Sequence, residues 1–339
     1  MNGLPIIFCG IVLLLESTVV AADPHEILVS VKIDVAACSA DGKLLAVGGP
    51  DGTVKVLETA TGKEVLSVQV GRLSISVLAF SRNGRLLAAG NGSGLVAVVE
   101  LANRSIVREW QGDEAVITAL AFANDARELV IASGNGTVRV RSLSDEAVST
   151  IVQGDADHVT DLAVSADGRM VAATFARGGL KFWKDGLSHA PVSAETMEPR
   201  EPYSRCLAFN PTGDQIAVAG YRHLRTFEFP SGKRLKSEKL FATRAGENVY
   251  DSESSEQFDI AYSPDGRTIA VAQQKSVQTI VRPYITGEIL MVDAQSLKTL
   301  HVFQGCRSSA VMVAFTSENK MITASYDDTV RIWEWRKTP

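Results

Sequence analysis

The chain has 339 residues, of which 45% are hydrophobic and 22% are charged, and its formal net charge is −5. This is an ordinary globular composition with enough apolar material for a large core. Its charges are spread without long runs, so no basic stripe supports nucleic-acid binding, and that class of function is excluded.

The first segment of the chain is typical of a secretory signal peptide. The apolar run from Leu4 to Leu15 is too short for the roughly 20 residues of a membrane-spanning helix, but it suits a signal-peptide hydrophobic region. Val20-Ala21-Ala22 offers small residues for cleavage, so we expect residues 1–22 to be removed and the chain to be periplasmic or secreted, with no membrane span afterwards. The alternative is a buried strand of the fold, since Met1-Asn2-Gly3 lacks the usual basic residue.

From residue 25 onward the chain is built of repeats. Each copy has a hairpin turn at an equivalent position, and the steps between copies are 42, 42, 42, 45, 53 and 53 residues, at Gly42, Gly84, Ala126, Gly168, Gly213, Gly266 and Asn319. A period of about 40–45 residues with four strands in each unit is typical of propeller blades. Residues 23–339 are therefore predicted to form a single seven-bladed β-propeller.

The second repeat illustrates the predicted strands. Its apolar run Val77–Phe80 suits an inner strand that is buried on both faces, and Asn83-Gly84 forms the following turn. Leu86–Ala89, Leu95–Leu101 and Ser105–Trp110 complete a four-stranded antiparallel blade. No unit shows a sustained helical period, so the fold class is all-β. Burial is predicted for the equivalent inner-strand residues Val77, Phe80, Leu120, Phe122, Leu162, Val164, Leu207, Phe209, Ile260, Tyr262, Val313 and Phe315.

The last repeat, Ser325 to Trp333, resembles the ending of a WD repeat, and Gly52–Val56 and Gly136–Val140 are weaker copies. The chain thus resembles the WD-repeat family over essentially its whole mature length. The resemblance implies a propeller that binds other proteins. It departs from the family where Gly-His is usual, so the family's His–Asp network is expected to be absent; those pairs are Gly112-Asp113, Gly154-Asp155 and Gly305-Cys306.

The two ends of the chain are predicted to meet in one blade. The chain stops just after the third strand of the seventh repeat, while His25–Val31 is a spare strand at the other end. Pairing His25–Val31 with Thr329–Trp335 completes the last blade and leaves no open ring.

The chain contains no motif for a catalytic, cofactor-binding or metal site. Sequences such as Gly-x-Ser-x-Gly, His-Glu-x-x-His and Cys-x-x-Cys are lacking, and no two histidines have metal-ligand spacing. After removal of the leader, Cys38, Cys206 and Cys306 are too few and too scattered for a disulfide framework; Cys38 and Cys206 suit small buried hydrophobic positions. No cofactor is expected. The alternative is a propeller hydrolase, lyase or quinoprotein-like redox module with its site at the central channel.

Two insertions interrupt the repeat in blades five and six, at Phe241–Glu256 and Lys275–Thr286. The resemblance implies that both lie on the same face of the ring, the top face. Loops on a rigid scaffold often carry function, although tolerated surface insertions explain them equally well. The sequence thus favours a monomeric, non-enzymatic scaffold that binds a protein or peptide outside the cytoplasm, with candidate partner-binding residues Arg282, Tyr284, Tyr326, Asp251 and Glu253.

Overall fold

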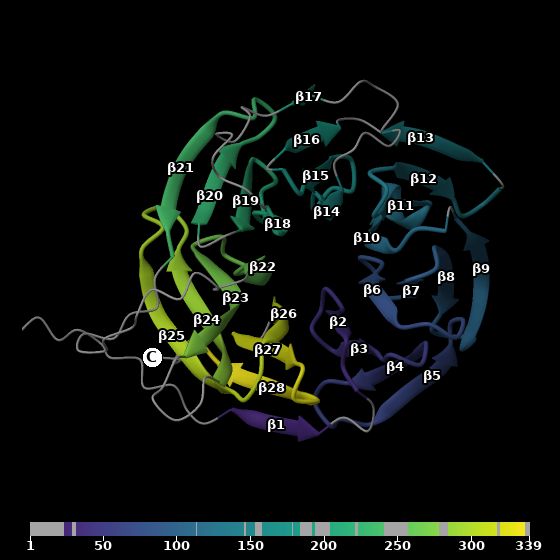
Figure 1. Ribbon diagram of the computed structural model, residues 1–339, viewed down its shortest axis with the longest axis horizontal. Coiled ribbons are helices and arrows are strands. Elements are labelled where there is room, and N and C mark those ends of the chain that lie inside the picture. The colour runs from purple at the N-terminus through teal and green to yellow at the C-terminus, as the bar shows by residue number, and fades with distance from the viewer. Residues whose placement is uncertain are drawn as a thin grey trace, which may run out of the picture.

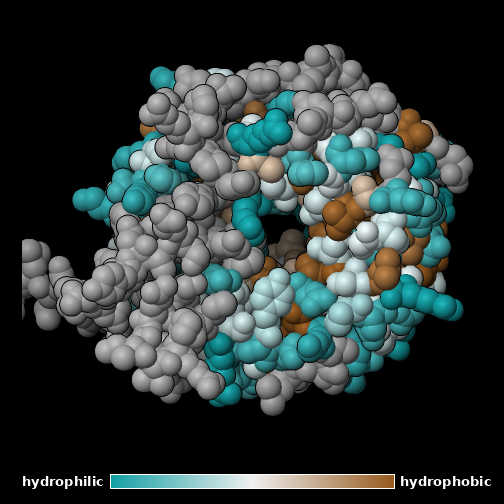
Figure 2. All heavy atoms as spheres, in the orientation of Figure 1, coloured by the Kyte–Doolittle hydropathy of each residue, from teal (hydrophilic) through white to brown (hydrophobic). Residues whose placement is uncertain are grey.

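Seven antiparallel sheets, each with four strands, stand in a ring in the part of the chain that the structure describes (Figure 1). The structure is a computed structural model. It describes residues 24–28, 32–112, 114–145, 147–152, 158–177, 179–183, 192–193, 204–220, 223–240, 257–277, 284–316 and 319–335. Figure 2 shows that the ring is hollowed at its centre. Within these ranges no helix has the length and apolar character needed to cross a membrane.

The blades follow one another in chain order, each from its inner to its outer strand. The first three blades contain β2 (Val35–Cys38), β3 (Leu44–Gly48), β4 (Thr53–Glu58) and β5 (Glu64–Gln69); β6 (Ile75–Phe80), β7 (Leu86–Asn91), β8 (Leu95–Glu100) and β9 (Ser105–Gln111); and β10 (Ile117–Ala123), η1 (Asn124–Ala126), β11 (Glu128–Ser133), β12 (Val138–Ser142) and β13 (Val148–Val152). Blades four and five contain β14 (Val159–Val164), β15 (Val171–Phe175), β16 (Leu180–Trp183) and β17 (Val192–Ser193); and β18 (Cys206–Phe209), β19 (Gln215–Gly220), β20 (His223–Glu228) and β21 (Arg234–Lys239). Blades six and seven contain β22 (Gln257–Tyr262), β23 (Thr268–Val277), β24 (Tyr284–Asp293) and β25 (Thr299–Cys306); and β26 (Ala310–Phe315), β27 (Lys320–Ser325), β28 (Thr329–Glu334) and β1 (His25–Leu28).

The repeated Ser-x-Asp-Gly sequence forms the hairpin between the first two strands of a blade. In blade one the Ser39 hydroxyl donates to the Asp41 carboxylate at 2.7 Å, and Asp41 accepts the backbone N–H of Lys43 at 3.1 Å. Gly42 takes a positive φ of 70°, which a glycine adopts without steric cost. The seven predicted hairpin positions all have positive φ, including the two that are not glycine, Ala126 and Asn319.

The inner strands pack both faces against neighbouring blades, and this corrects one predicted register. In blade two the residue equivalent to Leu120 is Leu78, which is buried, whereas Val77 is only partly buried. The run Val77–Phe80 is wholly apolar, so the apolar pattern alone does not distinguish Val77 from Leu78, whereas the 42-residue step back from Leu120 leads to Leu78. Of the predicted inner-strand residues, five are buried and the others are partly buried; the five are Leu120, Leu162, Leu207, Ile260 and Val313.

The N-terminal strand β1 is the outermost strand of the last blade, next to β28 (Figure 1). The register runs antiparallel from His25 opposite Ile332 to Leu28 opposite Thr329. Ile27 packs with the apolar cluster between blades seven and one. The remaining part of the predicted strand, residues 29–31, lies outside the described residues, as does the expected leader, residues 1–22.

The sequence suggested that the second insertion is a loop between two strands of ordinary length. In the structure it lengthens the hairpin instead. β23 and β24 have 10 residues each, and they stay paired as far as Val277 opposite Tyr284. The extra residues therefore extend the β-ladder of blade six beyond those of its neighbours. The first insertion, Phe241–Glu256, and residues 278–283 lie outside the described part of the chain.

Candidate functional site

Antiparallel pairing divides the turns of the ring between its two faces. Turns between the second and third strands of a blade lie on one face, together with the connections between blades. We call this the top face. Turns between the first and second strands, and between the third and fourth, lie on the opposite face, which we call the bottom face.

Tyr326 lies on the top face, in the turn between β27 and β28, and its exposed fraction is 48%. Its backbone N–H donates to the carbonyl of Ser309 at 3.1 Å. The Ser309 hydroxyl in turn donates to the side-chain oxygen of Gln274, on β23, at 2.8 Å. The turn of Tyr326 is therefore tied to the lengthened hairpin of blade six.

A buried ion cluster holds this turn in place. Asp327 accepts hydrogen bonds from the Ser325 hydroxyl at 2.8 Å and from the Arg331 guanidinium at 2.9 Å. Arg331 has a side-chain exposure of only 1%, and its Nε also donates to Glu26 of β1 at 2.9 Å. Burial by itself would raise the pKa of Asp327, but hydrogen bonds from Arg331, Thr329 and Ser325 and the charge of Arg331 lower it to about 2. Arg331 thus supplies a buried cation to Asp327 in a blade whose sequence has Gly305-Cys306 at the position of the family's Gly-His pair.

The same face continues across blade one to blade two. The backbone N–H of Ile33 donates to Asp328 at 2.9 Å, and the Ser74 hydroxyl donates to Asp34 at 2.8 Å. Leu73, next to Ser74, is 51% exposed. In Figure 2 hydrophobic side chains gather beside the channel mouth over β6 and β10, within a mostly hydrophilic or neutral face.

The structure describes only part of the predicted partner-binding set. It places Tyr326 beside the hairpin that carries Tyr284, whose backbone begins β24. The side chain of Tyr284 lies outside what the structure describes, as do residues Arg282, Asp251 and Glu253. Of the predicted set, the structure therefore locates the Tyr326 side chain and the Tyr284 backbone.

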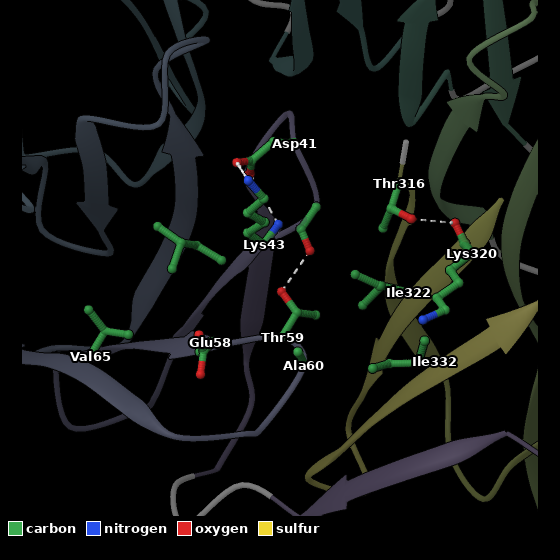
Figure 3. Close-up of a pocket in the computed structure, with 12 residues that line it drawn as sticks. Asp41, Lys43, Glu58, Thr59, Ala60, Val65, Thr316, Lys320, Ile322 and Ile332 are labelled. Carbon is green, nitrogen blue, oxygen red and sulfur yellow. Dashed lines mark hydrogen bonds and ion pairs between the residues drawn. The ribbon is translucent and has the colours of Figure 1, made fainter. Parts of the chain in front are cut away.

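A pocket of about 530 Å³ opens between blades seven and one, and sequence reasoning missed it (Figure 3). It lies on the bottom face, opposite Tyr326, because most of its walls are turns of that face. Its lining residues are Asp41, Gly42, Lys43, Leu44, Glu58, Thr59, Ala60, Val65, Thr316, Lys320, Ile322 and Ile332.

The pocket has an apolar interior with charges at its rim. Ile322 and Ile332 belong to the cluster between the two blades, and the Thr59 hydroxyl fixes one wall by donating to the Gly42 carbonyl at 2.7 Å. Hydrogen bonds from the Ser39 hydroxyl and the Lys43 backbone lower the pKa of Asp41 at the rim. The arrangement suits binding of an apolar group with polar flanks.

Two carboxylates of the inner strands join neighbouring blades, and these too were not predicted. Asp161 on β14 accepts the backbone N–H of Leu207 in the next blade at 2.9 Å. Asp259 on β22 accepts that of Val313 in the next blade, also at 2.9 Å. Burial raises the pKa of both carboxyl groups to about 7, although hydrogen bonds from backbone N–H groups lower it. At Asp259 the negative charge of Asp161 raises the pKa further. Both residues keep some exposed area, while the carboxyl groups themselves are buried enough that the loss of hydration is the largest effect on their pKa.

These raised pKa values predict that stability falls as the pH rises. A carboxyl with a higher pKa in the folded chain than the usual value near 4 stabilises the fold most when protonated. That contribution is complete below about pH 4 and is lost as the pH rises through about 7. We expect the melting temperature to fall between about pH 5 and about pH 8, and this slope to flatten in Asp161→Asn with Asp259→Asn.

The control for this prediction is Asp145→Asn, because hydrogen bonds lower the pKa of Asp145 and it stays ionised throughout that window. Cys206 lies within electrostatic reach of both carboxylates, but burial raises its thiol pKa well above the usual value, so it stays neutral. The charge of Arg205 acts on the Cys206 thiol in the opposite sense and lowers its pKa, but the effect of burial is larger. An unchanged slope in the double variant would show that the two carboxylates do not titrate in this range.

In the described ranges the potential metal ligands are not clustered and the three cysteines are free. No group of three or more His, Cys, Asp or Glu side chains there is arranged to hold a metal ion. Cys38, Cys206 and Cys306 are free thiols. Burial raises all three thiol pKa values, that of Cys38 to about 12, so these thiols are poor nucleophiles near neutral pH.

Comparisons with known proteins agree with the architecture. The family model "WD domain, G-beta repeat" matches residues 104–142 and 297–334, and "Anaphase-promoting complex subunit 4 WD40 domain" matches residues 28–83. No curated protein matches the chain. Among solved structures, the β-propeller domain of Cps50 (Swd1) from Myceliophteria thermophila superposes with a TM-score of 0.76 at 16% identity, covering 93% of this chain and 100% of that domain.

The residues that match the repeat model coincide with strands of the blades seen in the structure. Residues 104–142 span the outer strand of blade two and three strands of blade three, and residues 297–334 span β25 to β28. Seven four-stranded blades, repeat matches in three parts of the chain and the shared propeller fold lead to one assignment. The described part of the chain is a seven-bladed β-propeller, and its residues 28–83, 104–142 and 297–334 are similar to WD-repeat family models.

Proposed function

We propose that this chain is a non-enzymatic scaffold that acts outside the cytoplasm and binds a protein or peptide on its top face, beside blades six and seven. WD40 propellers generally bind protein partners, and the fold suggests such a role here. The observation that carries the location is Tyr326, a half-exposed aromatic side chain on a turn held by the buried Asp327–Arg331 pair.

A rigid turn makes Tyr326 a better anchor than an aromatic residue on a mobile loop. Tyrosine offers a large apolar surface and a polar tip, and it is enriched among residues that dominate protein interfaces. Fixing the turn before binding lowers the conformational entropy that association must remove. The tie through Ser309 to the long hairpin of blade six sets a second wall beside it.

The test is capture of a partner from the exported fraction on immobilised protein, with Tyr326→Ala compared against the unchanged chain. We expect Tyr326→Ala to weaken capture by about tenfold or more, which corresponds to a loss of about 1.4 kcal/mol of binding energy. The melting temperature should stay the same, because the side chain is half exposed. N-terminal sequencing of the exported chain should begin at Asp23 if the leader is removed as proposed.

Leu300→Ala is the matched control, because Leu300 is a 62% exposed apolar side chain on the outer strand β25, away from the top-face turns. It should leave capture unchanged. Equal capture by both variants and the unchanged chain would place the binding surface elsewhere, and an exported chain that still starts at Met1 would contradict the leader.

A further inference from the structure

We propose that the bottom-face pocket between blades seven and one binds the aromatic side chain of an extended peptide from a partner protein, in the place where other blades put an aromatic ring of their own. This site is separate from the top-face site proposed above. Results at Tyr326 therefore do not bear on it.

The argument begins with one position of the repeat. In blade two, Phe80 at the end of the inner strand pairs with Leu87; in blade one, Cys38 pairs with Leu45 at the same place. The register puts Val164 at this position in blade four and an aromatic ring in five other blades. The rings are those of Phe80, Phe122, Phe209, Tyr262 and Phe315. Blade one differs from these blades because it has Cys38 at this position, and blade one borders the pocket.

Each of these rings points toward the preceding blade. Phe80 packs in a cluster with Ala46 and Val56 of blade one, which lie on its second and third strands. The corresponding residues of blade seven are Ile322 and Ile332, and Cys38 packs in the same cluster as both. Ile322 and Ile332 also line the pocket. The pocket therefore reaches the apolar surface that an aromatic side chain would cover at the other seams.

The size and chemistry of the pocket fit a side chain of a partner. Its volume of about 530 Å³ is in the range of ligand-binding sites, far larger than the space of one buried water. Thr59 and Thr316 in its walls are buried, whereas Ala60, which lies beside Thr59, is exposed, so the cavity opens to the bottom face (Figure 3).

The charges at the rim select the flanks of the peptide. Among the lining residues of blade one, Asp41 and Glu58 carry negative charges and Lys43 carries a positive charge. The Lys43 amine lies 3.7 Å from the Asp41 carboxylate. This side therefore carries a net negative charge and favours a basic residue next to the buried ring. Lys320 stands on the blade-seven side, where an acidic residue or a peptide carbonyl can approach it.

The experiment measures binding of the capped peptide acetyl-Ala-Arg-Phe-Ala-amide by saturation-transfer NMR and titration, with acetyl-Ala-Arg-Ala-Ala-amide as the reference peptide. We expect saturable binding of the Phe peptide to the unchanged chain and to Cys38→Ser. Cys38→Phe should fill the space from within, raise the melting temperature and weaken binding by at least about tenfold. Equal binding of the two peptides, or undiminished binding to a folded Cys38→Phe chain, would overturn the proposal.

A second pair of variants tests the site without altering the core. Ala60→Trp places an indole at the exposed edge of the pocket, and Ala102→Trp places one at the equivalent exposed turn of blade two, 42 residues further along. We expect Ala60→Trp to weaken binding of the Phe peptide and Ala102→Trp to leave it unchanged. If both variants bind the peptide as the unchanged chain does, the ring does not enter this pocket.

Discussion

Deleting His25–Leu28 will destabilise the whole propeller by several kcal/mol. Ile27 packs in the cluster between blades seven and one, and burying such a side chain contributes about 1.5–3 kcal/mol when complete. Each hydrogen bond of the β1–β28 ladder adds about 1 kcal/mol. The deletion also removes Glu26 from Arg331 and leaves β28 as a bare edge, which favours association of chains.

The measurement is the free energy of unfolding in urea, together with the oligomeric state by light scattering. His25→Ala is the control for the deletion, because His25 is exposed and its backbone can keep the ladder. Ile27→Asp keeps the chain length but removes the packing, so it should show part of the loss. A deletion variant with an unchanged unfolding midpoint would mean that β1 contributes nothing to the closure of the ring.

The fold was predictable because each repeat contains a short sequence that forms a hairpin turn by itself. Ser39, Asp41 and Gly42 form a hairpin through local hydrogen bonds and one positive φ, so the pattern needs no tertiary information to be interpreted. Strand register was harder to predict, since the inner strand Ile75–Phe80 is apolar on both faces. The apolar run Val77–Phe80 has no polar residue to mark one face, so only the 42-residue step between the repeats identifies Leu78, and not Val77, as the equivalent of Leu120.

The candidate sites depended on contacts that the sequence cannot show. Glu26 and Arg331 lie 305 positions apart, and a single Arg in a strand pattern suggests a solvated charge, not a buried one. The pocket did leave a signal, because Cys38 stands where most blades have an aromatic ring. That signal becomes meaningful only when the equivalent positions of all seven blades are compared, because a lone cysteine in an apolar run also suits an ordinary buried position.

Replacing Arg331 by Met should cost about 3–5 kcal/mol, the usual effect of leaving one partner of a buried ion pair alone. The guanidinium is 1% exposed and contacts Asp327, Ser325 and Glu26 at 2.9–3.1 Å. Its loss leaves Asp327, itself only 11% exposed, with hydrogen bonds from neutral groups and no cation. The pKa of Asp327 should then rise from about 2, because burial would no longer be opposed by the charge of Arg331.

Two comparisons separate this charge effect from a loss of packing. Glu26→Gln should cost less than about 1 kcal/mol, since Glu26 is 43% exposed and its pair with Arg331 is screened by water. Combining Asp327→Asn with Arg331→Met should recover part of the loss, because no uncompensated charge stays buried. Urea unfolding gives the free energies. In the unchanged chain the contribution of Asp327 should be present above about pH 4 and fade as the pH falls toward about 2. If Arg331→Met and Glu26→Gln prove equally mild, the Asp327–Arg331 pair does not hold the turn of Tyr326, and the rigidity on which the top-face proposal relies is lost with it.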